Sequence, residues 1–233
     1  MAEHCSIFIT RYRAALFDMD GVVADTMPLH LKAWQEVFRS CGVAVDAMDV
    51  YLREGMQSAA MARGIAQEKG VRLTDEALEE MVAEKTRMFD REAAGARAYD
   101  GVPGTLRMLR NNGLRIALVT GSKAGSAETV LEAAGVRDLF DVVVTGDDTR
   151  KGKPDPDPYL KAIDKVHVNP LDCLVVENAP LGIRSAKAAG IGYVIGVTTT
   201  LAGEYLLEAD DIMGSLAELE QCLARRFAAR PVI

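Results

Sequence analysis

Two carboxylates stand one residue apart where a short apolar run ends, in Leu16-Phe17-Asp18-Met19-Asp20-Gly21. Because alternate residues of a strand point to the same side, Asp18 and Asp20 converge if the extended backbone continues past the apolar run. Two nearby carboxylates require a cation or a proton, and both solutions serve phosphoryl transfer. The pair therefore predicts a nucleophile beside an acid/base group at a strand end, with a simple turn as the alternative. A calcium loop of the EF-hand type is not indicated, since apolar residues follow Gly21.

Three later stretches, each expected at the end of a strand, accompany this first one. In chain order the four are Phe17-Asp18-Met19-Asp20-Gly21-Val22, Thr120-Gly121-Ser122, Gly152-Lys153-Pro154-Asp155-Pro156 and Glu177-Asn178-Ala179-Pro180-Leu181-Gly182. Together they resemble the signature motifs of the haloacid dehalogenase (HAD) superfamily, in particular its phosphatase and β-phosphoglucomutase-like branch. The resemblance covers nearly the whole chain and implies an enzyme that transfers phosphoryl groups.

The resemblance assigns chemical roles to the two acids. Asp18 is implied to be the nucleophile that attacks phosphorus and forms an aspartyl-phosphate, which splits one difficult displacement into two easier ones. Asp20 is implied to protonate the leaving alcohol and then to activate water. That role needs a raised pKa, which we expect a neighbouring anionic site to provide.

The second and third motifs supply the implied phosphate-binding groups. The resemblance gives the Thr120 hydroxyl and the Gly121 amide to a phosphate oxygen, and it gives Lys153 the positive charge that faces the phosphoryl group and restrains Asp18. A strand-end cap at Thr120 and a solvated surface lysine at Lys153 are the alternatives.

The resemblance also implies Mg²⁺ as the cofactor, because hard oxygen ligands suit this ion. It assigns the Asp18 carboxylate, the Asp20 backbone carbonyl and a fourth-motif acid as ligands. Many relatives have Glu-Asp in that motif, whereas this chain has Glu177-Asn178. An amide oxygen can coordinate, but the site loses a negative charge. We expect weaker Mg²⁺ binding unless Glu177 compensates, and tighter binding in Asn178→Asp.

The chain around these motifs alternates short apolar runs with helical segments. Strands are expected near residues 14–17, 115–120, 140–144, 173–176 and 193–197, with helices between the later ones. This pattern predicts an α/β fold, a doubly wound, Rossmann-like parallel sheet. Ligands of such sheets bind at the carboxyl ends of the strands, where all four motifs fall.

The interval from residue 27 to residue 99 lacks strand-like runs and has helical periodicity instead. We therefore expect an all-helical cap domain at 27–99, inserted into a Rossmann-like catalytic core formed by 1–26 and 100–233. The resemblance implies a helical cap at the same place.

The cap holds the candidate substrate residues His30, Gln57 and Lys85. A histidine at the position of His30 couples cap closure to the acid/base Asp in β-phosphoglucomutases, and Lys85 falls near a cap lysine of that family. Against a mutase, its Gly-x-Ser-Arg pattern is replaced by Gly55-Met56-Gln57-Ser58, so the bidentate anchor for a second phosphate is missing. A polar hinge residue is the alternative role for His30.

The sequence therefore favours a Mg²⁺-dependent phosphatase acting on a small phosphate monoester such as a sugar phosphate. A β-phosphoglucomutase-type transfer within a sugar phosphate is the second reading. A non-catalytic ligand-binding protein on the same fold is disfavoured because Asp18, Asp20, Thr120 and Lys153 are all present.

Composition agrees with a small-molecule enzyme. A formal net charge of -7 argues against nucleic-acid or anionic-membrane partners, and the absence of long apolar runs argues against a membrane span. We expect a cytoplasmic protein, and the sequence gives no indication of its oligomeric state. Four separated cysteines without a C-x-x-C pair are expected to be reduced, mostly buried thiols: Cys5, Cys41, Cys173 and Cys222.

Overall fold

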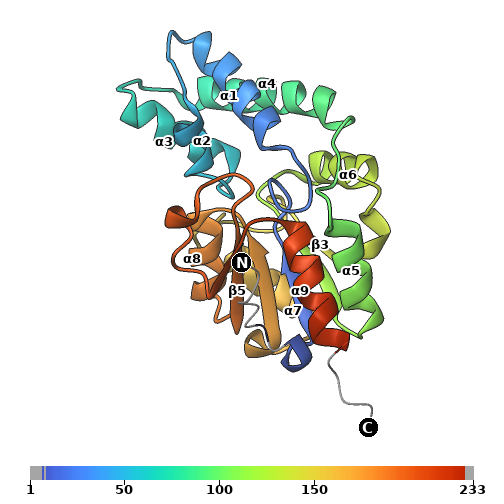
Figure 1. The fold of residues 1–233 in the computed structure, drawn as a ribbon. Coiled ribbons are helices and arrows are strands. Elements are labelled where there is room, and N and C mark those ends of the chain that lie inside the picture. Colours follow the sequence, from blue (N-terminus) through green and yellow to red (C-terminus); the bar gives the residue numbers. More distant parts are fainter. Residues whose placement is uncertain (1–6, 8, 229–233) are drawn as a thin grey trace.

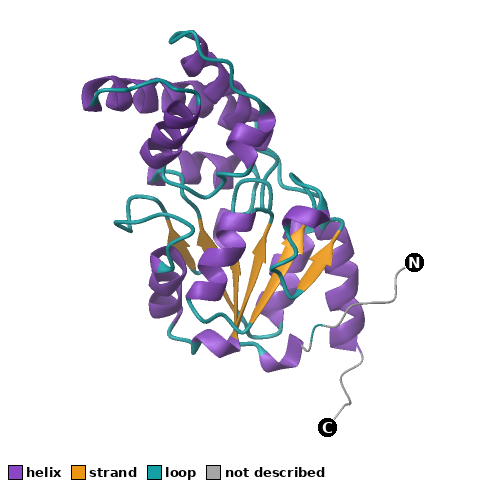
Figure 2. Ribbon diagram, turned by 90° about the vertical axis from the view of Figure 1, so that its left-hand side faces the viewer, coloured by secondary structure: helices purple, strands orange, loops and turns teal. Residues whose placement is uncertain are grey.

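The computed structural model describes residue 7 and residues 9–228, and in them a six-stranded parallel sheet carries helices on both faces (Figures 1 and 2). The strand order is β3-β2-β1-β4-β5-β6. The strands are β1 (Ala14–Phe17), β2 (Arg115–Val119), β3 (Val142–Val144), β4 (Cys173–Glu177), β5 (Tyr193–Val197) and β6 (Asp211–Met213). The predicted α/β class and the five predicted strands are confirmed, and the short edge strand β6 is an addition.

Alternate residues of β1 face opposite layers. Ala15 and Phe17 belong to one apolar cluster with residues of α5 (Val102–Asn111), α6 (Ala124–Ala133) and α9 (Leu216–Ala228). Ala14 and Leu16 belong to another with residues of α7 (Asp157–Val166) and α8 (Pro180–Ala188). A strand that is buried on both faces must be apolar throughout, which explains the run before Asp18.

Four helices between β1 and β2 lie over the carboxyl ends of the strands (Figure 2). They are α1 (Met27–Arg39), α2 (Ala47–Tyr51), α3 (Ser58–Glu68) and α4 (Asp75–Ala93). They pack around an apolar cluster of their own, which includes Trp34, Phe38 and Ile65. We therefore propose the division expected above, a cap at 27–99 and a core at 1–26 and 100–233. The end of α4 touches the core cluster through Phe89 and Ala93.

The cysteines only partly follow the expectation of reduced, buried thiols. Cys173 is a buried free thiol, whereas Cys41 is free but exposed. Cys222 is buried but disulfide-bonded, so the expectation of mostly buried cysteines holds for the described ones, and the expectation of a reduced thiol is wrong at Cys222. The prediction for Cys5 lies outside the described residues.

None of the described helices is long and apolar enough to cross a membrane.

Candidate active site

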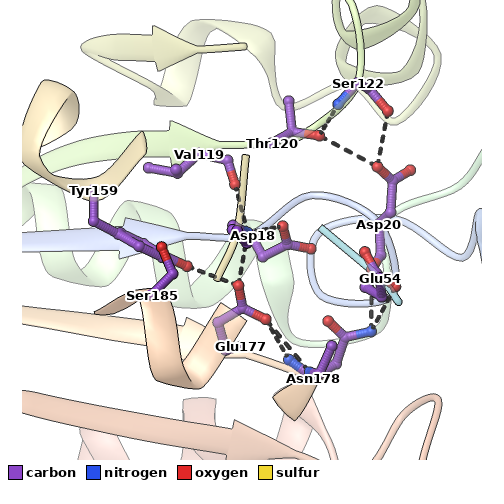
Figure 3. A network of polar contacts seen from close by, with 12 residues as sticks. Asp18, Asp20, Glu54, Val119, Thr120, Ser122, Tyr159, Glu177, Asn178 and Ser185 are labelled. Carbon is purple, nitrogen blue, oxygen red and sulfur yellow. Dashed lines mark hydrogen bonds and ion pairs between the residues drawn. The ribbon is translucent and has the colours of Figure 1, made fainter. Parts of the chain in front are cut away.

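Asp18 follows β1 directly and is buried at the centre of the sheet edge (Figure 3). Lys153, from the loop after β3, places its Nζ 2.5 Å from Asp18 Oδ1 and donates to the Val119 carbonyl at 3.1 Å. Both side chains are at most 2% exposed, so solvent screens this ion pair very little. The strand order brings these residues together although 135 positions separate them in the sequence.

Glu177, the last residue of β4, holds the other side of Lys153. Its Oε1 lies 2.6 Å from Lys153 Nζ and 2.8 Å from the Tyr159 hydroxyl. Its Oε2 accepts hydrogen bonds from the backbone amides of Asn178 at 3.0 Å and Ala179 at 3.4 Å. A carboxylate has about four lone-pair positions, and all are used here. The expected role of Glu177 as a metal ligand therefore finds no free oxygen in this arrangement.

These contacts fix the charges at the base of the site. Burial raises the pKa of the Asp18 carboxyl to about 8; Lys153 opposes this rise, and Glu177 and Asp20 add to it. Burial lowers the pKa of Lys153, but Asp18 and Glu177 more than offset this and hold it well above its ordinary value. Lys153 is therefore a permanent cation, while Asp18 needs further positive charge to stay ionised.

Asp20 lies next to Asp18 and accepts four side-chain hydrogen bonds. Oδ1 accepts from Thr26 at 2.6 Å and contacts His30 Nε2 at 2.9 Å, and Oδ2 accepts from Thr120 at 3.3 Å and Ser122 at 3.1 Å. Burial raises the pKa of Asp20, but His30 and Thr26 outweigh burial and hold it below the ordinary value. The expected raised pKa is therefore not found, because hydrogen-bond donors surround the ionised form.

The cap reaches Asp20 through His30 and Lys85. Lys85 Nζ lies 2.7 Å from His30 Nδ1, and an ammonium group can only donate. His30 must then accept at Nδ1 and donate from Nε2 to Asp20, which assigns its neutral tautomer. Burial and Lys85 both lower the pKa of His30, and burial lowers that of Lys85 to about 8.

The turn after α2 brings the cap against the core. Gly55 has a φ of +82°, and a Cβ there would lie 2.5 Å from Lys153 Cδ. Gln57, expected to contact substrate, instead donates from Nε2 to the backbone carbonyls of Gly146 at 3.3 Å and Thr149 at 3.0 Å. Its side chain thus fastens the cap to a core loop.

Asn178 and Asp18 each keep one buried oxygen without a partner. Asn178 Nδ2 donates to the Asp20 carbonyl at 3.1 Å and to Thr200 Oγ1 at 2.8 Å, while Asn178 Oδ1 and Asp18 Oδ2 have no hydrogen bond. Among the described residues no group of three or more His, Cys, Asp or Glu side chains has a metal-binding arrangement. The possible metal donors here are of three kinds instead: the Asp18 carboxylate, the Asn178 amide oxygen and the Asp20 backbone carbonyl.

A cavity of about 30 Å³ separates the cap from the core. Its polar lining comes from both halves and includes Asp20, His30, Glu54, Lys85 and Ser122. Trp34, Met56 and Met61 supply apolar walls. Such a volume holds about two water molecules, so the arrangement is a closed one.

Comparison with known sequences decides the family. The family profile described as haloacid dehalogenase-like hydrolase matches residues 12–190, which include all four motifs. The chain belongs to this family.

Relatives of this HAD-like hydrolase act on phosphate esters. Validoxylamine A 7'-phosphate phosphatase of Streptomyces hygroscopicus subsp. limoneus is 36% identical over 209 residues, 89% of this chain and 96% of the relative. Fructose-1-phosphate phosphatase YqaB of Escherichia coli is 35% identical over 188 residues, 79% and 96% of the two chains. β-Phosphoglucomutase of Bacillus subtilis is 30% identical over 215 residues, 89% and 91%. The protein is thus an enzyme that acts on phosphate esters.

A solved structure supports the fold. β-Phosphoglucomutase from Clostridium difficile superposes with a TM-score of 0.82 at 23% identity, and the match covers 93% of this HAD-like hydrolase and 99% of that chain. The Rossmann-like core with a helical cap is therefore shared with that enzyme.

Four residues of the site were not predicted as site residues from the sequence. Thr26, Ser122 and Tyr159 bond to Asp20 or Glu177, and Glu54 approaches Asn178 from the cap. Ser122 stands inside the second motif, so its position was the available signal. The other three are single polar residues whose partners lie 6 to 124 positions away.

Proposed function

We propose that the protein is a Mg²⁺-dependent phosphatase that hydrolyses a small phosphate monoester, such as a sugar phosphate, through an aspartyl-phosphate at Asp18. The observation that carries the proposal is the state of the Asp18 carboxylate. Lys153 holds Oδ1 at 2.5 Å, while the buried Oδ2 has no partner. One oxygen is thus fixed by a cation and the other is free for a ligand.

The donors around this free oxygen fit Mg²⁺. Asp18 Oδ2 and Asn178 Oδ1 are unpartnered, and the Asp20 carbonyl lies beside Asn178. Hard oxygen donors of this kind match the preference of the ion. When bound, Mg²⁺ would neutralise charge on the phosphoryl group and keep Asp18 ionised.

Asp18 and Lys153 perform the first displacement in this proposal. The Asp18 carboxylate attacks phosphorus, and the ammonium of Lys153 stabilises negative charge on the equatorial oxygens. Asp20 donates a proton to the departing alcohol, which requires that the anionic substrate raise its pKa from the low value of this arrangement.

The second displacement suits the observed state of Asp20. Held ionised by its donors, Asp20 accepts a proton from the water that attacks the aspartyl-phosphate. His30 fixes the Asp20 carboxylate from the cap, so the base is correctly aimed only while the cap is closed. A sugar phosphate needs a pocket far larger than the present cavity, so the cap must open for each substrate to enter.

A phosphoglucomutase-type transfer is the second candidate, favoured by the similarity to the Bacillus subtilis mutase and by the His30 contact. It is weakened because Gln57 is occupied by core carbonyls and no arginine follows it. Water is then the simpler acceptor.

The test is phosphate release with Mg²⁺ over a panel of phosphate monoesters that includes fructose 1-phosphate and β-glucose 1-phosphate, the latter with and without a bisphosphate primer. Release that disappears in Asp18→Asn supports the phosphatase. Glucose 6-phosphate formed only with the primer would make the protein a mutase, and turnover by Asp18→Asn would overturn the nucleophile.

A further inference from the structure

Glu54 is a buried cap carboxylate that the proposed reaction does not use. It lies in the turn between α2 and α3 and is 5% exposed. Its hydrogen bond to the core is long, 3.4 Å from Asn178 Nδ2 to Oε2, and no ion pair involving Glu54 is found among the described residues. A carboxylate buried this deeply is costly unless a cation or further donors satisfy it.

The local charges point to the kind of partner that is required. Six charged side chains are buried among the described residues, and all lie in this site: Asp18, Asp20, Glu54, Glu177, Lys85 and Lys153. Burial raises the pKa of Asp18 and Glu54, so both need added positive charge to stay ionised; with all six groups ionised and His30 neutral, four acids face two lysines. The excess of two negative charges equals the charge of one divalent cation.

The position of Glu54 is equally specific. Figure 3 shows Glu54 beside Asn178, with Asp18 across the same space, and Asp18 and Asn178 each have one unpartnered buried oxygen. Asn178 is a neutral amide where the resemblance implies an acid, and Glu177 has no oxygen left to replace it. Gly55 allows this approach, since any side chain there would strike Lys153.

We propose that Glu54 holds the divalent cation together with Asp18 and Asn178, and that it supplies from the cap the negative charge that Asn178 lacks. This inference rests on the proposed Mg²⁺ dependence. Because Glu54 belongs to the cap and the other donors to the core, the cation stabilises the closed arrangement, and closure in turn tightens the cation.

The experiment measures Mn²⁺ binding without substrate, from the free-ion signal in electron paramagnetic resonance. Glu54→Gln is compared with wild type and with Glu79→Gln, which alters an exposed cap acid. We expect Glu54→Gln to weaken binding by about ten- to a hundredfold and Glu79→Gln to leave it unchanged. Equal affinity of Glu54→Gln and wild type overturns the inference but not the proposed phosphatase.

The double variant Glu54→Gln/Asn178→Asp distinguishes the loss of a negative charge from a folding defect. It returns a negative charge to the core side, so we expect it to recover most of the lost affinity. If circular dichroism shows Glu54→Gln folded and the double variant stays weak, charge compensation is overturned. A wild type that binds no Mn²⁺ would overturn this inference and the proposed metal dependence together.

The fluorescence of Trp34 gives a second test of whether cation binding closes the cap. Trp34 is the single tryptophan of the chain, and it lines the cavity under the cap. Saturating Mn²⁺ should change the fluorescence emission of Trp34 in the wild type. The change should be much smaller in Glu54→Gln when the same fraction of sites is occupied. Free tryptophan serves to correct both signals for quenching by Mn²⁺. An identical change in both proteins contradicts a role of Glu54 in closure.

Discussion

The core half and the cap half of the site balance their charges in different ways. In the core, Lys153 contacts both Asp18 and Glu177 within 2.6 Å, and Glu177 has every oxygen position filled. In the cap, Lys85 Nζ lies 2.7 Å from neutral His30 and over the rings of Trp34 and Phe89, and Glu54 has no ion pair among the described residues. The core half is therefore assembled by folding alone, whereas the cap half is completed by what binds between the two.

Mutations in the two halves should therefore have different effects on folding and on catalysis. Groups at the strand ends are fixed by the sheet and by one another, so their loss should damage both folding and chemistry. Groups on the cap are held by fewer bonds, so their loss should change catalysis or closure more than folding.

The largest effect is expected for Lys153→Met, which leaves Asp18 and Glu177 buried without their cation. Removal of one partner from a buried pair costs about 3–5 kcal/mol, and turnover should fall on the order of 10³-fold or more. Urea unfolding and phosphate release measure the two effects. Lys161→Met, at an exposed site on α7, is the matched control. A Lys153 variant as stable as its control would contradict a preassembled core half.

A smaller effect is expected for His30→Ala, which removes the Nε2 donor from Asp20. Because His30 positions the acid/base group, kcat should fall about ten- to a hundredfold with little change in unfolding free energy. His30→Gln keeps an amide donor and should retain more of the activity. A loss confined to KM would show that His30 serves binding and not the aim of Asp20.

Lys85→Met tests whether the buried ammonium of Lys85 destabilises the folded protein. At neutral pH the variant should be as stable as wild type or more stable, by up to about 1 kcal/mol, because it removes a buried ammonium without an anionic partner in contact. Burial lowers the folded pKa of Lys85 to about 8, while the unfolded value stays near 10.5.

The pH dependence of the difference in stability between wild type and Lys85→Met is a second test. Below about pH 8 both states keep the proton, and the folded protein bears the full cost of the charge. Between pH 8 and 10.5 the folded state releases its proton first, so the stability of wild type rises relative to that of the variant. Denaturant midpoints across this range measure the difference. A constant difference would contradict the lowered pKa.

The smallest effect is expected for Gln57→Ala, which removes two bonds between the cap and the core loop. The free energy of unfolding should fall by about 0.5–1 kcal/mol, and trypsin should cut faster at Arg150 and Lys151, next to the loop carbonyls that Gln57 binds. Gln67→Ala, exposed on the same helix, is the control. If both variants resist proteolysis equally, Gln57 does not fasten the cap.

The core half was largely predictable from the sequence, because its residues sit in short motifs at strand ends. Asp18, Thr120 and Glu177 each follow an apolar run, and parallel strands place such ends at one edge, while Lys153 stands in a recognisable Gly-Lys-Pro motif. The β6 strand was missed because Asp211-Ile212-Met213 forms no apolar run, whereas the equally short edge strand β3 consists of three valines.

The cap half resisted prediction because its contacts depend on how two separately packed units meet. Glu54 and Asn178 are 124 positions apart, and nothing near Glu54 marks it as buried. Gln57 was expected to face substrate, since helical spacing gives a face but not the neighbour across it. The pKa of Asp20 could not be inferred either, because four donors from three segments determine it.

The central claim is that Asp18 carries the phosphoryl group between substrate and water. The direct measurement is mass spectrometry of the protein after acid quenching during turnover of the fastest ester in the panel. We expect one added phosphoryl group on the peptide that contains Asp18, and no adduct and no phosphate release in Asp18→Asn. Phosphorylation at another residue, or turnover by Asp18→Asn at the wild-type rate, would contradict it.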